Sequence, residues 1–211
     1  MSLRRSFTSR WLSDPNQTRA AGAVKCTMFL LRHGQSYFNL HFTPTRVDPG
    51  IEDPELTELG LTQAHAAAAG LAHVPLTRII VSPYIRALQT AQPILKFHPV
   101  AVEIMHEVRE RAAFTCDVGS HPDVLAKRFP HHDFEHLPSR WWSESVETLA
   151  ATTQRADDFR AMIASREDAK TTLLVSHWAF ILALTGKSLE NGEILEYDPR
   201  NGKPERIDWE S

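Results

Sequence analysis

CTMFLLRHGQSYFN, residues 26–39, begins with a run of apolar or β-compatible residues at positions 27–31. A short run without a polar interruption predicts the central strand of a sheet, buried on both faces. Arg32 and His33 follow directly, so a fixed positive charge and an imidazole lie where the strand passes into a loop. Gly34 has no Cβ and lets backbone or ligand approach closely. We therefore expect a phosphate site to begin at the end of this strand.

Length, charge and cysteine content narrow the class of protein. A chain of 211 residues suits one α/β domain that buries about 70% of the surface exposed by the unfolded chain. The net charge of −3 gives no electrostatic reason to expect nucleic acid or an anionic membrane as the main partner. Two cysteines are too few for a disulfide framework, and no apolar run approaches the roughly 20 residues of a membrane span. We expect a cytoplasmic protein that folds without a disulfide or a metal.

The first 24 residues differ in composition from the rest of the chain. They contain four arginines, several serines and threonines, and a single acidic residue. Such an N-terminal arm is compatible with an organelle transit peptide, a disordered extension, an expression remnant or a packing strand. We expect the folded domain to cover residues 25–211, with a cap insertion around residues 112–145.

Strand and helix patterns alternate along the rest of the chain. This alternation predicts a mostly parallel sheet with helices on both faces, that is, a three-layer α/β/α sandwich. Proline and glycine predict an irregular connection over residues 37–55 and short helices in the cap. The other strands are expected at residues 77–81, 100–105, 170–175 and 193–197. Helices are expected from Thr57 or Thr62 to residue 72, and at residues 82–96, 146–165 and 179–184, the last ending at Gly186.

Two further strands end in residues whose chemistry matches that of His33. Arg86 lies one turn into the helix after strand 77–81, and His177 follows strand 170–175. Ligands of open α/β sheets bind beyond the carboxyl ends of the strands, so these side chains should converge. Guanidinium groups bind phosphoryl oxygens through a planar fork that stays charged at neutral pH. The convergence predicts a pocket for a phosphoryl group.

A neutral His33 in such a pocket is a competent nucleophile. Its attack on phosphorus would give a phosphohistidine and divide one difficult displacement into two easier ones. Arg32, Arg86 and His177 would stabilise the charge that develops on the phosphoryl oxygens.

The leaving oxygen needs a proton, and two carboxyl groups are candidates. Glu107 and Glu110 both follow the strand expected at residues 100–105. A carboxyl group in a half-buried anionic pocket has a raised pKa, and it can later deprotonate the attacking water. These considerations leave both residues open as the general acid.

Four motifs occur in a set order along the chain. They are LLRHGQSYFN at 30–39, DPELTELGLTQA at 53–64, SPYIRALQTA at 82–91 and LVSHWAF at 174–180. Together they resemble the histidine phosphatase superfamily, in its phosphoglycerate mutase-like branch, and the resemblance spans residues 27–197. It implies that Glu110, in a segment similar to the family's Leu-x-Glu, is the acid, with Glu107 in reserve. It also implies the remaining roles: His33 as the phosphorylated nucleophile, Asn39 as a substrate contact, and Arg32, Arg86 and His177 as the phosphate pocket.

The chain departs from the family pattern at Trp178, because the residue after the second histidine is commonly glycine. We expect this indole to contact substrate and to narrow or reshape the pocket. The chain is also shorter than the cofactor-dependent mutases, and a shorter cap favours hydrolysis. We therefore expect a phosphatase for phosphate monoesters that uses no metal or cofactor, with a phosphoglycerate mutase or a catalytically silent binding module as alternatives. The expected substrate is a small phosphorylated metabolite, with a phosphoprotein as the alternative, and the sequence does not determine the oligomeric state.

Three other patterns in the sequence carry a second possible interpretation. Cys26 and Arg32 have the Cys-x5-Arg spacing of cysteine-dependent phosphatases, but the five residues between them predict a strand and not a phosphate-binding loop. The pair Trp141 and Trp142 is expected to pack the cap. A solvated cap is expected, and not a zinc site, for the four histidines His121, His131, His132 and His136.

Overall fold

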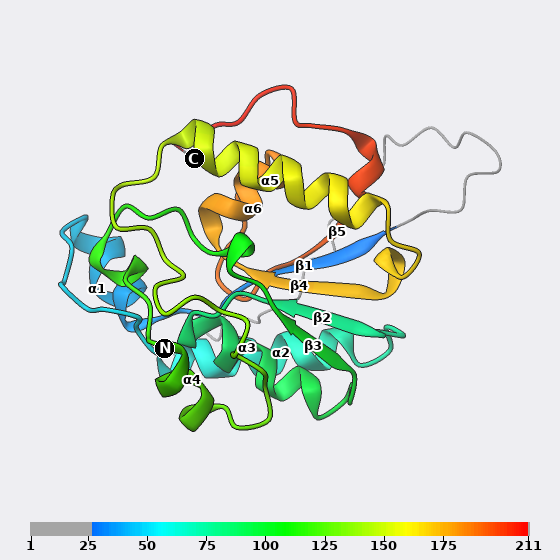
Figure 1. Ribbon diagram of the computed structural model, residues 1–211, viewed down its shortest axis with the longest axis horizontal. Helices are drawn as coiled ribbons and strands as arrows, with labels where there is room; N and C mark the ends of the chain where they lie inside the picture. Colours follow the sequence, from blue (N-terminus) through cyan, green and yellow to red (C-terminus); the bar gives the residue numbers. More distant parts are fainter. Residues whose placement is uncertain (1–26, 211) are drawn as a thin grey trace, which may run out of the picture.

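The computed structural model describes residues 27–210, and its core is a five-stranded sheet (Figure 1). The strands are β1 (Met28–Arg32), β2 (Arg78–Val81), β3 (Ala101–Ile104), β4 (Thr172–Ser176) and β5 (Ile194–Tyr197). Their order is β3-β2-β4-β1-β5, in which β5 runs antiparallel to β1 and every other pair is parallel. The sheet is therefore mostly parallel, as predicted.

β4, and not β1, is the central strand of this sheet. All five residues of β4 are buried, whereas β1 has the antiparallel β5 on its outer side. The prediction of a central β1 was wrong because an apolar run indicates burial on both faces but does not indicate the position of a strand. Since β4 lies between β1 and β2, the carboxyl ends of these three parallel strands are adjacent.

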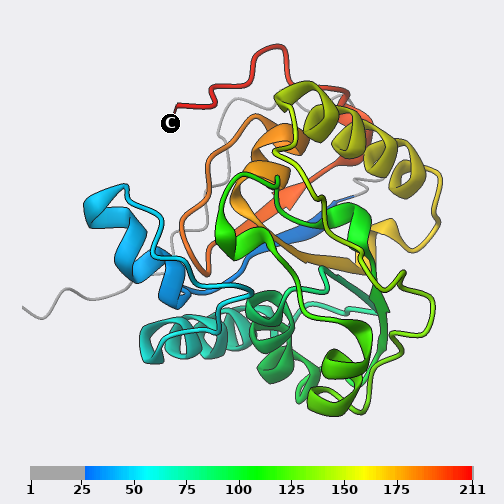
Figure 2. The same cartoon turned by 60° about the vertical axis from the view of Figure 1, so that its left-hand side comes forward.

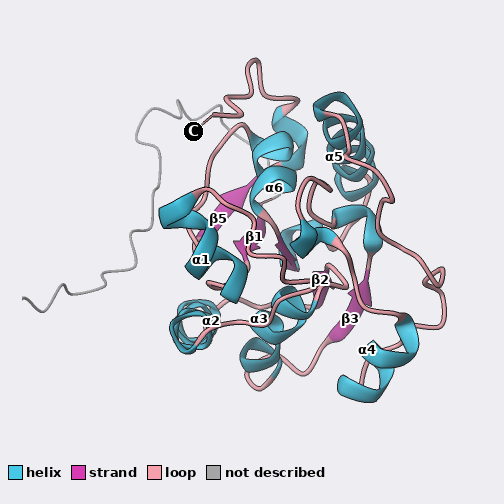
Figure 3. Cartoon of the chain, turned by 90° about the vertical axis from the view of Figure 1, so that its left-hand side faces the viewer, coloured by secondary structure: helices cyan, strands magenta, loops and turns pink. Residues whose placement is uncertain are grey.

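Two helices cover each face of the sheet (Figure 3). α2 (Glu58–Leu71) and α3 (Ile85–Leu95) pack on one face, and α5 (Leu149–Ala164) and α6 (Trp178–Thr185) pack on the other. Alternate residues of a strand enter opposite cores, as Leu31 and Leu30 do in β1. The predicted three-layer α/β/α sandwich is confirmed.

The irregular connection predicted over residues 37–55 is wrong at its start, where α1 spans Tyr37–Thr45. The side chain of Ser36 accepts a hydrogen bond from the Asn39 amide at 3.3 Å, and Asn39 Oδ1 accepts one from the Ser36 amide at 3.1 Å. This reciprocal capping box satisfies two backbone donors and starts the helix. α1 follows the end of β1 and projects from the body of the molecule, where it is drawn in blue in Figure 2.

The remaining helices follow the sequence patterns closely. α2 begins after Thr57, whose Oγ1 accepts a hydrogen bond from the Gly60 amide at 3.1 Å, so Thr57 and not Thr62 is the N-cap. α6 ends at Gly186, which has a φ of 71° and needs no Cβ in this left-handed conformation. The cap contains the short helix α4 (Pro122–Arg128), as expected. Four 3-10 helices complete the described chain: His106–Val108, Thr115–Asp117, Ala169–Thr171 and Pro199–Asn201.

The cap is anchored on the start of α3 by an aromatic contact. The rings of Trp141 and Tyr84 pack in an edge-to-face contact with centroids 4.7 Å apart, and the Trp141 Nε1 donates to the Ser120 carbonyl at 2.9 Å. A Cβ on Gly119 would lie 2.3 Å from the Trp141 ring, so the backbone passes directly against the indole. Trp141 therefore packs the cap, as predicted.

Two expectations fall partly or wholly outside the described residues. The arm predicted at residues 1–24 and the side chain of Cys26 lie in the part of the chain that the structure does not describe. Within residues 27–210, no helix is both long enough and apolar enough to cross a membrane.

Candidate active site

Side chains from three neighbouring strand ends meet at the carboxyl edge of the sheet. His33 directly follows β1, His177 directly follows β4, and Arg86 lies in the first turn of α3, after β2. The rings of His33 and His177 have centroids 5.1 Å apart and an interplanar angle of 58°. The predicted convergence therefore occurs, because β4 lies between β1 and β2.

His33 is held in the tautomer that a nucleophile requires. Its Nδ1 lies 2.7 Å from the Gly34 carbonyl oxygen, and a carbonyl only accepts hydrogen bonds, so Nδ1 carries the hydrogen and Nε2 keeps its lone pair. The side chain is buried, and this burial together with the charges of Arg86 and Arg32 holds the pKa of His33 well below its usual value. The imidazole is therefore neutral at pH 7.

His177 presents one ring nitrogen that has no protein partner. Its Nε2 lies 2.7 Å from Ser82 Oγ, and its Nδ1 is buried without a hydrogen-bond partner among the described residues. Burial, Arg86 and His33 hold the pKa of His177 well below its usual value, so this ring is also neutral at pH 7. A buried polar atom without a partner is uncommon in folded proteins and indicates a place for a ligand.

Arg32 shows the same feature. Its Nη1 donates to the Leu189 carbonyl at 2.6 Å, but its Nε is buried and has no partner within the described chain. Burial lowers the pKa of Arg32, but a guanidinium group stays charged in proteins. Its charge acts on the pKa of both His33 and His177, so Arg32 belongs to the same cluster.

Arg86 is an enclosed charged residue, with 2% of its surface exposed. Its Nη1 donates to the Cys116 carbonyl at 2.8 Å, and its Nη2 lies 3.3 Å from Asp117 Oδ1. The guanidinium carbon lies 4.2 Å from the centroid of the Tyr84 ring. The cap segment and an aromatic face thus hold Arg86 from several sides.

Of the two candidate acids, Glu110 is the one that the structure places in this cluster. Its Oε1 accepts hydrogen bonds from the Arg111 amide at 2.9 Å and from the Ala179 amide, in the first turn of α6, at 3.0 Å. Burial raises the pKa of Glu110, and the charge of Asp117 raises it further. Glu107 has a 55% exposed side chain and lies 3.4 Å from His106.

The predicted substrate contacts have other partners in the structure, and their roles toward substrate stay predictions. Asn39 belongs to the capping box of α1. A Cβ on Gly34 would lie 2.4 Å from the Gly60 carbonyl oxygen, so the close approach at Gly34 is made by the protein's own α2. Trp178 Nε1 donates to Ser188 Oγ at 2.9 Å.

Sequence reasoning missed several polar residues around the cluster. Asp53 and Asp117 are buried carboxylates that accept hydrogen bonds from backbone amides of the cap. Asn191 Nδ2 donates to the His33 carbonyl at 3.0 Å. Asp53 and Ser82 lie inside the quoted motifs and could have been singled out there, whereas Asp117 and Asn191 lie in segments without a periodic pattern.

Cysteine and metal chemistry find no support in the described chain. β1 is a regular strand up to Arg32, so the residues after Cys26 do not form a phosphate-binding loop. Cys116 is buried, and this burial raises the pKa of its thiol. No group of three or more metal-ligating side chains occurs within residues 27–210, which include His121, His131, His132 and His136.

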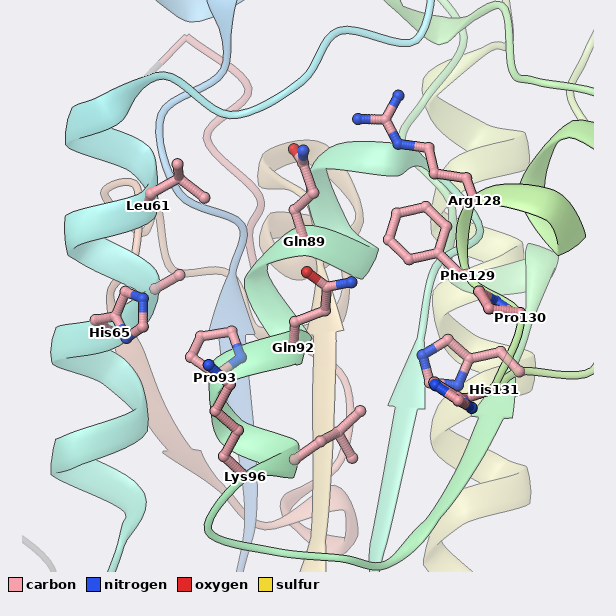
Figure 4. Close-up of a pocket in the computed structure, with 13 residues that line it drawn as sticks. Leu61, His65, Gln89, Gln92, Pro93, Lys96, Arg128, Phe129, Pro130 and His131 are labelled. Atoms are coloured by element: carbon pink, nitrogen blue, oxygen red, sulfur yellow. The ribbon is translucent and has the colours of Figure 1, made fainter.

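A hollow of about 590 Å³ lies between α2, α3 and the segment that follows α4 (Figure 4). His65, Gln92 and Lys96 are among the residues that line it, and none of the five predicted catalytic residues does. Its arginine, Arg128, is paired with Glu55 at 2.6 Å. The hollow is therefore distinct from the cluster at the strand ends.

Comparison with known proteins identifies the family. Residues 28–207 match the model of the histidine phosphatase superfamily (branch 1). Over 169 residues the chain is 27% identical to an adenosylcobalamin/alpha-ribazole phosphatase of Salmonella typhimurium, with 77% of this chain and 79% of that protein covered. Over 95 residues it is 37% identical to a 2,3-bisphosphoglycerate-dependent phosphoglycerate mutase of Rhizobium etli, with 44% and 42% covered.

Solved structures share the fold. A mycobacterial glucosyl-3-phosphoglycerate phosphatase is similar with a TM-score of 0.57 and 21% identity, over 82% of this chain and 90% of that one. At this identity the likeness concerns the fold alone. The chain belongs to branch 1 of the histidine phosphatase superfamily, which confirms the family and the phosphatase class that the sequence predicts.

Proposed function

We propose that the protein hydrolyses phosphate monoesters through a phosphohistidine formed on His33. The observation that carries the proposal is the pair of unpartnered polar atoms, Arg32 Nε and His177 Nδ1. Four buried side-chain polar atoms lack a hydrogen-bond partner within the described residues, and these two belong to the cluster around His33. An unmet buried donor costs about 1–3 kcal/mol, and an oxyanion ligand such as a phosphoryl group would satisfy both.

The first step uses the lone pair of His33 Nε2, which the hydrogen bond from Nδ1 to Gly34 leaves free. Nε2 attacks phosphorus and forms the P–N bond, while the bond to the leaving oxygen breaks. Glu110 gives its proton to that oxygen, a role that fits a carboxyl group whose pKa is raised by burial. The products of this step are the free alcohol and the phosphohistidine.

The second step reverses the proton transfer. The Glu110 carboxylate takes a proton from a water molecule, whose oxygen attacks phosphorus as the P–N bond breaks. Inorganic phosphate leaves, and His33 and Glu110 return to their starting states. Arg32 and Arg86 bear permanent charges beside the phosphoryl oxygens in both steps, which is the main contribution a protein makes to phosphoryl transfer.

The substrate we propose is a small phosphorylated metabolite, handled in the cytoplasm by a protein that needs no metal or cofactor. The phosphatase of Salmonella typhimurium supports a small ester, since its name refers to the metabolite alpha-ribazole. Trp178, first residue of α6, is proposed to limit the size of the group attached to the phosphate. A phosphoprotein is the alternative substrate.

The test is hydrolysis of an aryl phosphate in the presence of a metal chelator. Wild-type protein should turn over and carry acid-labile, base-stable phosphate, and His33→Ala should lose both. His65→Ala is the matched control, because His65 is an exposed histidine of α2. Hydrolysis that persists in His33→Ala would exclude the mechanism.

A phosphoglycerate mutase activity is the second candidate function. It is supported by the similarity to the Rhizobium etli mutase, which covers 44% of this chain. A mutase would interconvert 2- and 3-phosphoglycerate after priming with 2,3-bisphosphoglycerate, and it would release little inorganic phosphate. A coupled assay of both products separates the two activities. Absence of both, in a protein that still binds phosphate, would instead indicate a binding module.

A further inference from the structure

Arg86 contacts the cap through a buried ion pair that sequence reasoning did not foresee. Its Nη2 lies 3.3 Å from Asp117 Oδ1, and the two side chains are 3% and 2% exposed. The neighbouring Nη1 donates to the Cys116 carbonyl at 2.8 Å. An arginine that is proposed to hold the phosphoryl group therefore already has an anionic partner inside the protein.

Asp117 is itself fixed by the cap and not by Arg86. Its Oδ2 accepts hydrogen bonds from the Ala113 and Phe114 amides, both at 3.0 Å. Its backbone carbonyl accepts the Tyr84 hydroxyl at 2.5 Å. Two amides of the cap and the Tyr84 hydroxyl thus hold Asp117 in place beside Arg86.

We propose that Asp117 is a positioning residue, which orients Arg86 and offsets part of its charge so that the phosphate product is released. The proposal rests on the proposed phosphatase function and extends it to a residue of the cap. A guanidinium group offers five N–H donors in a fixed fork, so the contacts with Cys116 and Asp117 leave donors for a phosphoryl group. An uncompensated buried arginine would hold dianionic phosphate more tightly and slow its release.

The same carboxylate also acts on the general acid. After burial, the charge of Asp117 is the largest cause that raises the pKa of Glu110. Removing that charge should lower the pKa of Glu110 and leave less of it protonated at neutral pH. Asp117 therefore influences both phosphate affinity and proton donation, which makes its effect distinguishable from that of a structural contact.

Asp53 supplies a matched control. It is 6% exposed, and its two oxygens accept hydrogen bonds from the Ile85 amide at 2.9 Å and from the Ser120 amide at 3.0 Å. It therefore ties the cap to α3 much as Asp117 does. Its carboxylate bonds backbone amides, whereas that of Asp117 also pairs with the Arg86 side chain.

The experiment compares Asp117→Asn with Asp53→Asn by steady-state kinetics over pH and by calorimetric titration with inorganic phosphate. We expect Asp117→Asn to lower kcat about tenfold or more, to lower KM, to tighten phosphate binding severalfold, and to move the alkaline limb of kcat to lower pH. Asp53→Asn should lose thermal stability, and it should change the phosphate affinity and the pH limb much less than Asp117→Asn does, because the Asp53 carboxylate bonds backbone amides and not the Arg86 side chain.

Weaker phosphate binding with an unchanged pH limb in Asp117→Asn would overturn the proposal, since that is the result of a purely structural contact. If Asp117→Asn does not fold, Asp117→Glu is the variant to measure. It keeps the negative charge, so the alkaline limb of kcat should stay near that of the wild type, while the longer side chain displaces Arg86 and lowers kcat. A shifted limb in Asp117→Glu would contradict the proposal. If the wild-type protein hydrolyses no phosphate ester, the proposed phosphatase function is refuted. The role of Asp117 can still be tested in that case, because the titration measures the affinity for inorganic phosphate without turnover.

Discussion

The Nε2 of His177 lies 2.7 Å from the hydroxyl oxygen of Ser82, and neither side chain is exposed to solvent. Of the two possible directions of this hydrogen bond, we predict the one in which the Ser82 hydroxyl donates to Nε2. The ring hydrogen of the neutral His177 is then on Nδ1, the atom that has no protein partner. In this arrangement Ser82 makes His177 offer a donor, and not a lone pair, to a bound oxyanion.

Ser82→Ala should lower kcat/KM about tenfold, because losing one hydrogen bond of about 1.4 kcal/mol lets the ring adopt either tautomer. Nitrogen-15 NMR of His177 should show hydrogen on Nδ1 in the wild type and a mixture of tautomers in the variant. Ser82→Thr, which keeps the hydroxyl, should restore the wild-type spectrum. A wild-type ring with its hydrogen on Nε2 would refute the assignment.

Glu110→Gln should slow the hydrolysis of alkyl phosphates by about 10²–10⁴-fold, the usual contribution of a general acid. Aryl phosphates with acidic leaving groups should be affected far less, because their leaving oxygen needs no proton. Glu107→Gln is the control, since Glu107 has a 55% exposed side chain. If the rate of Glu107→Gln, and not that of Glu110→Gln, depends on the leaving group in this way, Glu107 is the general acid and Glu110 is not.

Buried neutral histidines should make the stability depend on pH. The pKa of His177 is lowered by burial, Arg86 and His33, so its contribution is complete above the unfolded pKa of about 6.5 and is lost as the pH falls below it. The loss is about 1.4 kcal/mol per pH unit for one proton. Urea unfolding from pH 7.5 to 5.0 should therefore show a smaller decrease on acidification for His177→Gln than for the wild type.

Equal slopes for the wild type and His177→Gln would show that His177 takes up its proton equally in the folded and unfolded states. The comparison between the two proteins is needed because burial raises the pKa of Asp53, Glu110 and Asp117, and these groups act in the opposite direction. His65→Gln, at an exposed position of α2, serves as the control and should have the wild-type slope.

Gly34→Ala should destabilise the protein by about 1–3 kcal/mol, the usual cost of forcing an atom into a packed interior. The added Cβ would lie 2.4 Å from the Gly60 carbonyl oxygen, which is backbone and has little freedom to move. Gly70→Ala is the control inside α2: its nearest neighbour would be the Ile194 Cδ1 at 3.8 Å, and it should stabilise the helix by about 0.5–1 kcal/mol. Chemical denaturation of both variants tests the contrast, and equal stabilities would contradict it.

Local sequence patterns were sufficient to predict the site where a buried strand and reactive side chains lie within a few residues of each other. An apolar run that ends in Arg32 and His33 predicts a strand with a site at its end, and the same holds for the strand before His177. The alternation of strands and helices then predicts a parallel sheet, whose strand ends lie at one edge. Those two steps place His33, Arg86 and His177 at one edge of the sheet, and the strand order, with β4 between β1 and β2, brings them together.

Local sequence patterns failed to predict two features of the fold, namely helix α1 and the order of the strands. α1 was missed because its capping box, between Ser36 and Asn39, competes with a nearby Pro44 that favours a loop. The central position of β4 was also missed, since β1 and β4 are both short and mostly apolar runs. Strand order depends on how the helices between the strands pack, and no window of sequence records that.

The sequence alone predicted His33 as the candidate nucleophile together with its cationic neighbours, because each lies at or shortly after the end of a predicted buried strand. Only the tertiary structure decided the partners of these groups. Gly34 lies against Gly60, Ser82 against His177, and Arg86 against Asp117, which is 31 residues further along the chain. A polar group that is removed from water depends on the atoms that the fold brings beside it. Burial therefore lets these contacts determine the tautomer of a histidine, the pKa of a titratable group and whether a donor has a partner.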